Sequence, residues 1–150
     1  MRAICEGIQQ LLRERGIPHQ VVTHAAVFTS EEAAQVRGVP LEWGVKAMVL
    51  KARDHFILVC IRADKKVDFH QVKRWEGTSK IRLATAPEVL QLTGCEIGSV
   101  PPFGHLQPLQ TYLDQGLLAQ EKVTFNIGLH EVSVVMAGKD LTQVMDATLF

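Results

Sequence analysis

Apolar residues recur along the chain with two different periods, so the sequence predicts helices as well as strands. Ile4, Ile8 and Leu12 share one face of an N-terminal helix, which Gly16 ends. Capping residues and apolar spacing predict further helices over 31–37, 68–75, 86–92 and 141–145. Runs of β-branched and apolar residues predict strands over 19–23, 45–52, 56–63, 109–113, 122–126 and 131–136.

The order of these elements favours an α+β domain with a mixed or antiparallel sheet. Strands 45–52 and 56–63 form a predicted hairpin, and strands cluster in pairs instead of alternating strictly with helices. No repeat, low-complexity tract or linker interrupts the 150 residues. We therefore expect a single domain that spans residues 1–150.

The composition is that of an ordinary folded protein, with 47% hydrophobic and 21% charged residues. No apolar run has the length of a membrane span, and the N-terminus lacks the residue order of a signal peptide. Cys5, Cys60 and Cys95 are far apart, with no Cys-x-x-Cys pair. We therefore expect a cytoplasmic protein with no membrane contact, no disulfide and no zinc site.

The charges are balanced overall but unevenly distributed. The chain has 16 basic and 16 acidic residues; positions 46–82 hold ten basic and four acidic ones, a net charge of +6, which leaves −6 elsewhere. A basic middle suits a polyanion that docks on one side of the protein. Folding can equally point these residues in different directions, and the sequence leaves both outcomes open.

One segment combines two glycines with two adjacent prolines. It reads Gly98, Ser99, Val100, Pro101, Pro102, Phe103 and Gly104. Proline removes amide donors and fixes φ, so the segment is neither a regular helix nor a central strand. Either it is a rigid turn, or the remaining N–H groups of its first three residues are available to a ligand.

Lys46 stands out because a strand over 45–52 places it on the same face as Met48 and Leu50. A lysine among apolar neighbours pairs with an acid, extends its ammonium group to solvent, or points toward an anionic ligand. Its position near the start of the strand is accessible to a cleft. The pattern alone leaves these roles open.

Two histidines are further candidates for substrate contacts. His130 follows a glycine turn, where it either donates a hydrogen bond to a substrate or caps a strand end. His24 lies between a strand and a helix, where it either lines a cleft or is bonded within its own loop. The chain lacks the Gly-x-Ser-x-Gly, His-Glu-x-x-His, Gly-x-x-x-x-Gly-Lys and Gly-x-Gly-x-x-Gly motifs, so we expect no metal and no cofactor.

In their order and spacing, these pieces make the chain similar to the YbaK/prolyl-tRNA synthetase editing-domain family over almost its whole length. Lys46, in Lys-Ala-Met-Val-Leu-Lys, matches the characteristic lysine of that family. The segment from Gly98 to Pro102 matches its Gly-x-x-x-Pro pattern, and Gly128-Leu129-His130 matches its late glycine–histidine segment. Further matches are Arg15-Gly16-Ile17-Pro18, Thr23-His24 and Thr29-Ser30-Glu31-Glu32-Ala33-Ala34.

The resemblance implies a barrel-like, largely antiparallel mixed sheet flanked by helices. It also implies an aminoacyl-tRNA deacylase, which removes a small amino acid such as alanine or cysteine from the 3′ acceptor end of tRNA-Pro or a related tRNA. The chain carries no synthetase catalytic core, so we expect a free-standing enzyme that edits in trans. An aminoacyl-tRNA synthetase is a candidate second partner.

An aminoacyl ester is already activated, so an enzyme has mainly to position it and stabilise the tetrahedral oxyanion. We expect the donors to be the N–H groups of Gly98, Ser99 and Val100, with Lys46 holding phosphate or ribose and His130 anchoring the substrate or relaying a proton. Further predicted substrate contacts are His24, Thr29, Met48, Leu50, Pro101, Pro102, Phe103 and Gly104. The resemblance implies a role for the ribose hydroxyl of the substrate and a water, so we assign no protein general base.

Two other functions are compatible with the sequence. A non-catalytic module with the same fold would bind tRNA or a synthetase without turnover. A small-molecule esterase or amidase that uses the same loop would hydrolyse simple esters and be indifferent to tRNA. The presence of the lysine, the loop and the histidine together favours the deacylase, and the oligomeric state is not predicted.

Overall fold

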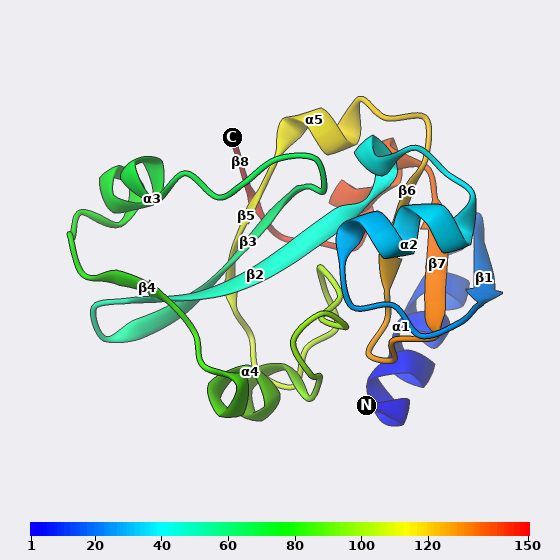
Figure 1. Ribbon diagram of the computed structural model, residues 1–150, viewed down its shortest axis with the longest axis horizontal. Helices are drawn as coiled ribbons and strands as arrows, with labels where there is room; N and C mark the ends of the chain where they lie inside the picture. Colours follow the sequence, from blue (N-terminus) through cyan, green and yellow to red (C-terminus); the bar gives the residue numbers. More distant parts are fainter.

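The computed structural model describes residues 1 to 150, and its strands form two separate sheets (Figure 1). The smaller sheet is antiparallel and has the order β1 (His19–Thr23), β7 (Val132–Met136), β6 (Val123–Asn126). The larger sheet has the order β4 (Ile81–Leu83), β2 (Val45–Ala52), β3 (His55–Arg62), β5 (Gln110–Leu113), β8 (Thr148–Leu149). β5 runs parallel to both of its neighbours, whereas β2 is antiparallel to β3 and β4.

Helices pack around these sheets, and capping side chains set several of their ends. They are α1 (Arg2–Glu14), α2 (Ser30–Arg37), α3 (Phe69–Glu76), α4 (Ala86–Thr93), α5 (Gln115–Leu118) and the 3₁₀ helices η1 (Leu41–Trp43) and η2 (Gly138–Gln143). Thr29 Oγ1 accepts a hydrogen bond from the N–H of Glu32 at 3.1 Å, and Gly38 ends α2 with φ of 68°. These contacts set the two ends of α2, which together with β2 lines the candidate site.

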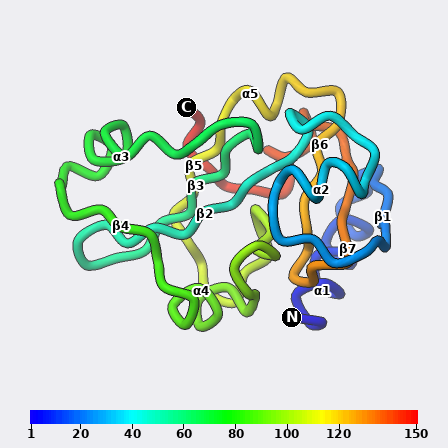
Figure 2. Tube along the Cα trace, in the orientation of Figure 1, coloured from blue at the N-terminus to red at the C-terminus, as the bar shows by residue number.

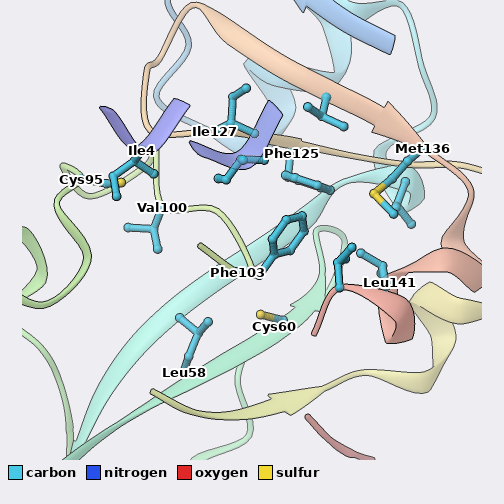
Figure 3. Packing of buried hydrophobic residues seen from close by; sticks show 14 of the residues in the cluster. Ile4, Leu58, Cys60, Cys95, Val100, Phe103, Phe125, Ile127, Met136 and Leu141 are labelled. Atoms are coloured by element: carbon cyan, nitrogen blue, oxygen red, sulfur yellow. The ribbon is translucent and has the colours of Figure 1, made fainter. Parts of the chain in front are cut away.

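The β2–β3 hairpin separates two groups of buried side chains. Because side chains alternate along a strand, Val49, Leu58 and Cys60 face the main core, whereas Leu50 and Ile57 face a second cluster near α3. Figure 3 shows part of the main core, in which side chains from β3 and from the 98–104 loop pack together. The hairpin is therefore held rigidly on both faces.

The α+β class and the mixed, largely antiparallel sheet arrangement are confirmed, but the sheet does not close into a barrel. One isolated bridge, between Gly44 and Thr124, links the two sheets through the backbone, and the main core packs side chains from both. The predicted helix over 141–145 is wrong, because residues 138–143 form a 3₁₀ helix. The sequence also missed β4, α5 and β8, which have only three, four and two residues and so carry no readable periodicity.

Candidate functional site

A cavity of about 410 Å³ lies between β2, α2 and the loop that follows α4. Its volume is in the range of sites that hold a drug-sized ligand, and it is larger than a single amino acid requires. In Figure 2, the yellow-green loop that follows α4 runs toward the space between β2 and β6. Of the residues that line the cavity, 13 of 21 are hydrophobic.

The cavity exists because one edge of β2 is only partly covered. β4 pairs with Leu50–Ala52 and stops there, so no strand lies beside residues 46–48 on the side away from β3. The hairpin turn has two residues, which makes Ala52 and His55 a hydrogen-bonded pair. By alternation, the N–H and C=O of Ala47 point to the uncovered edge, so main-chain groups as well as side chains border the cavity.

Lys46 lines this cavity, and its ammonium group has no hydrogen-bond or ion-pair partner within the chain. Met48 and Thr29 also line it, as predicted from the sequence. Leu50 does not, because it is fully buried in the second cluster, where β4 covers the strand. Of the residues of β2, those up to Val49 therefore line the cavity, and the predicted substrate contact by Leu50 is not supported.

The loop from Gly98 to Val100 contains two residues that line the cavity and have free backbone donors. Gly98 and Val100 line it, and neither N–H has a partner in the chain. Gly98 has φ of 91°, a conformation that glycine adopts at little cost. The prediction of a free N–H at Ser99 is wrong, because that group donates to the carbonyl of Glu96 at 3.0 Å and Ser99 is fully buried.

Residues 101–104 hold the loop in place and do not border the cavity. Pro101, Pro102 and Phe103 are buried, and Phe103 packs edge-on against Phe125 with ring centroids 5.6 Å apart. Gly104 has φ of 82°, and a Cβ there would lie 2.7 Å from the side chain of Ile8. The geometry therefore does not favour direct substrate contact by these four residues. Their packing restricts the movement of the neighbouring amide groups.

His130 lies behind the cavity wall. Its Nδ1 donates to the carbonyl of Val27 at 3.1 Å, and its ring packs against Phe28 with centroids 4.5 Å apart. A Cβ built on Gly98 would lie 3.4 Å from the ring. His130 thus ties Phe28 to the Gly98 loop, and its Nε2 has no partner in the chain.

His24 belongs to a network beside the cavity and does not line it. Its Nδ1 donates to the carbonyl of Ala25 at 2.7 Å, so its Nε2 accepts from Ser133 Oγ at 2.7 Å. Arg37 donates from Nε to the same Oγ at 3.0 Å and from Nη2 to Asn126 Oδ1 at 2.5 Å. This chain of hydrogen bonds fastens α2 to β6 and β7.

Arg37 and Asn126 line the cavity, and the sequence did not single out either one. Arg37 has no carboxylate partner, and burial lowers the pKa of its guanidinium to about 10. Glu31, at the start of α2, is the one acidic residue among those that line the cavity. The cavity therefore combines two cations that lack an acidic partner with a single carboxylate.

An apolar rim surrounds the entrance. Phe28, Leu83 and Ile97 line the cavity, yet their exposed fractions are 65%, 50% and 55%. Such exposure of large apolar side chains around one cavity is typical of a ligand-binding surface. No group of three or more His, Cys, Asp or Glu side chains is arranged to hold a metal ion.

None of the helices combines the length and the apolar character needed to cross a membrane.

Comparisons with known proteins agree on one family. The model of the aminoacyl-tRNA editing domain matches residues 24–144. The multifunctional Ser/Thr-tRNA deacylase ProXp-y of Escherichia coli K12 is 32% identical over 144 residues, which cover 93% of this chain and 86% of that protein. The proline–tRNA ligase of Bacillus subtilis 168 is 34% identical over 116 residues, which cover 76% of this chain and 21% of the ligase.

Solved structures give the same result for the fold. A candidate trans-editing enzyme for prolyl-tRNA synthetase superposes with a TM-score of 0.87 at 32% sequence identity. The match covers 98% of this chain and 94% of the other. The two proteins therefore share a fold over nearly the whole length of both chains.

Proposed function

The chain belongs to the aminoacyl-tRNA editing-domain family, and on that premise we propose that it hydrolyses the ester between an amino acid and the 3′ end of a mischarged tRNA. One observation carries the proposal. A single cavity contains the unpartnered ammonium group of Lys46 and the unpaired N–H groups of Gly98 and Val100. A site that places donors around a bound ester is what deacylation requires.

The two free amides are the proposed oxyanion donors. Attack on the ester carbonyl places negative charge on its oxygen, and fixed N–H groups stabilise that charge without reorganisation. Removing one such donor typically costs roughly 3–4 kcal/mol of transition-state stabilisation. The buried Pro101 and Phe103 hold these donors in position before the substrate arrives.

Lys46 is the proposed cationic contact for the terminal ribose or phosphate. Its side chain carries a compact charge that no acid in the chain neutralises. Glu31 provides the complementary charge, because the α-ammonium group of an aminoacyl ester needs an acceptor and Glu31 is the carboxylate at the cavity. The two charges orient the ester between them.

As the resemblance to the editing-domain family implies, the nucleophile we propose is a water molecule activated by the ribose hydroxyl of the substrate itself, and no histidine, cysteine or aspartate lines the cavity. His130 then acts as a positioning residue, since it holds Phe28 and the Gly98 loop from behind. The exposed ring of Phe28 offers the terminal base a stacking surface. In this proposal the protein contributes to catalysis by positioning the substrate and by electrostatic stabilisation.

The proposed amino acids are small ones, including alanine and cysteine, as the resemblance to the editing-domain family implies; the cavity of about 410 Å³ does not by itself select among them. The relative from Escherichia coli is named for serine and threonine, so these belong in the same test. The test measures the release of amino acid from tRNAs charged with alanine, cysteine, serine, threonine or proline. Hydrolysis of at least one mischarged tRNA supports the proposal, whereas salt-sensitive binding without any release contradicts it and favours a non-catalytic module.

A further inference from the structure

Four basic side chains line a second depression at the far end of β2 and β4. They are Lys51, Arg53, Lys80 and Arg82, which with Ser79 and Ile81 form its whole lining, so no acidic residue borders it. Its volume is about 250 Å³. Most other basic residues of positions 46–82 do not gather in this way; Arg62 pairs with Asp64, for example, and Lys65 pairs with Asp114.

Lys51 and Arg82 lie on a face of the sheet that borders the main cavity at Val49 and Ala84, whereas Lys46 borders the cavity from the opposite face of β2. Lys51 and Arg82 are directly opposite each other across β2 and β4. Because side chains alternate along a strand, Lys51 shares its face with Val49, and Arg82 shares its face with Ala84. Val49 and Ala84 both line the main cavity. The cavity and the basic depression thus adjoin along this face.

The arrangement is electrostatically unfavourable for the protein alone. Like charges directly opposite each other across a sheet destabilise it. Arg82 is partly neutralised by Glu88, at 2.8 Å, whereas Lys51, Arg53 and Lys80 have no acidic partner. Arg53 is also the one residue other than glycine with a positive φ, 55°. Unneutralised cations of this kind are what a phosphate backbone would bind.

The spacing suits a strand of nucleic acid that leaves the cavity. From Val49 to Lys51 the chain advances two residues, which is roughly 7 Å along a strand, and Arg53 lies in the turn that follows the end of β2 at Ala52. One strand of a duplex places a phosphate every ~3.4 Å of axis, and an extended strand places them further apart. The depression therefore begins within a few nucleotides of the ester site.

We infer that Lys51, Arg53, Lys80 and Arg82 bind the phosphates of the nucleotides that precede the aminoacylated 3′ terminal one. The inference rests on the proposed function, because it places the terminal nucleotide in the main cavity. The contacts are with phosphates, so they position the tRNA without reading its sequence.

The test compares two variants that each lose four positive charges. The first is Lys51→Gln/Arg53→Gln/Lys80→Gln/Arg82→Gln. The matched control is Arg2→Gln/Arg13→Gln/Lys122→Gln/Lys139→Gln, whose four residues are exposed and whose side chains make no hydrogen bond or ion pair. Figure 1 shows that α1, which holds two of the control positions, lies far along the molecule from β4. Circular dichroism and thermal melting verify that both variants fold.

The measured quantities are the affinity for uncharged tRNA as a function of salt and the hydrolysis of two substrates. We expect the first variant to lose at least ~10-fold in affinity near 0.1 M salt and to lower the slope of log affinity against log salt by about 3. Its KM for charged tRNA rises by a similar factor, kcat changes less than about 2-fold, and hydrolysis of a minimal 3′-aminoacyl-adenosine ester is unchanged. The control variant changes the slope by less than half as much.

Failure of this inference and failure of the proposed function give different results. If the wild type hydrolyses both substrates but the first variant keeps the wild-type salt slope, the phosphate site is wrong and the deacylase stands. An equal loss of slope in both variants also overturns the phosphate site. If the wild type hydrolyses neither substrate, the deacylase is wrong, and the tRNA affinities still decide whether the four cations bind phosphates.

Discussion

Along β2, residues 46–48 have no partner strand on the side away from β3, whereas Leu50–Ala52 are paired on both sides. The uncovered half borders the cavity with Lys46, and the covered half presents Lys51 to a basic depression. Two lysines five positions apart thus occupy different electrostatic settings. Because both residues are lysines, the difference comes from β4, which pairs with Leu50–Ala52 and leaves residues 46–48 uncovered.

The largest effect is expected at Gly98, where a side chain would alter both the backbone and the cavity. Gly98→Ala places alanine at φ of 91° and 3.4 Å from His130, so the free amides shift. We expect kcat for deacylation to fall about 10²–10³-fold, as for the loss of an oxyanion donor. Single-turnover hydrolysis of a mischarged tRNA measures this.

Gly77→Ala is the matched control for backbone strain. Gly77 has a similar positive φ, 66°, and no atom lies within 4 Å of a Cβ built there. It should lose about 1–2 kcal/mol of stability and keep its rate. If both variants lose activity equally, the role of the Gly98 loop at the ester is wrong.

The two lysines of β2 should separate in the same assay. Lys46→Ala removes the unpartnered cation of the cavity, and a charge-assisted contact of roughly 1.5–3 kcal/mol corresponds to about a 10–10²-fold fall in kcat/KM on a minimal 3′-aminoacyl-adenosine ester that carries a 5′-phosphate. Lys51→Ala should leave hydrolysis of that minimal ester unchanged. Equal rates for wild type and Lys46→Ala would remove Lys46 from the mechanism.

Arg37 lines the main cavity and Arg53 lines the basic depression, and substitutions at the two arginines should change the free energy of unfolding by different amounts. Arg37→Met leaves the buried oxygens of Asn126 and Ser133 without a donor, which should lower the free energy of unfolding by about 1–3 kcal/mol. Arg53 is exposed and its side chain makes no hydrogen bond, so Arg53→Met should change stability by less than about 0.5 kcal/mol. Urea unfolding measures both, and an equal loss would contradict the structural role of the Arg37 network.

The smallest expected effect is a pH dependence of stability that comes from His105, whose side chain bonds to Pro101 in the 98–104 loop. Burial lowers the pKa of His105 below 6.5, and its Nε2 donates to the carbonyl of Pro101 at 2.6 Å. The unfolded chain therefore binds the proton first, so stability is complete above pH 6.5 and declines as the pH falls below it. His105→Gln should make the free energy of unfolding depend less on pH between pH 7 and 5.5 than in wild type. The same substitution at the exposed His70 should leave that slope as in wild type, and a steeper slope in His105→Gln would contradict the sign.

Local features of the sequence predicted most of the fold and part of the site. The helix predicted over 31–37 depends only on neighbouring residues, so it could be read directly, and the structure shows that Thr29 caps it. Lys46 and Gly98 could also be identified, because a lysine among apolar strand residues and a Gly-Pro-rich loop are unusual patterns. Both residues line the cavity.

What the sequence could not show depends on contacts between distant segments. Arg37 is an ordinary basic residue in the last turn of a helix, and its partners Asn126 and Ser133 lie 89 and 96 positions away. Leu50 shares a strand face with Lys46, but the short strand β4 covers its part of β2. Ser99 was expected to offer a free amide, and only the fold of its loop shows that Glu96 accepts from it.

Oxyanion stabilisation by the free amides of Gly98 and Val100 is tested most directly by amide NMR with a hydrolysis-resistant 3′-amide analogue of aminoacyl-adenosine. Ser99 serves as an internal reference, because its N–H already donates to Glu96 at 3.0 Å. We expect the amide ¹H resonances of Gly98 and Val100 to move downfield on binding, and that of Ser99 to move much less. Unchanged resonances at Gly98 and Val100 in the saturated complex would contradict their role as oxyanion donors.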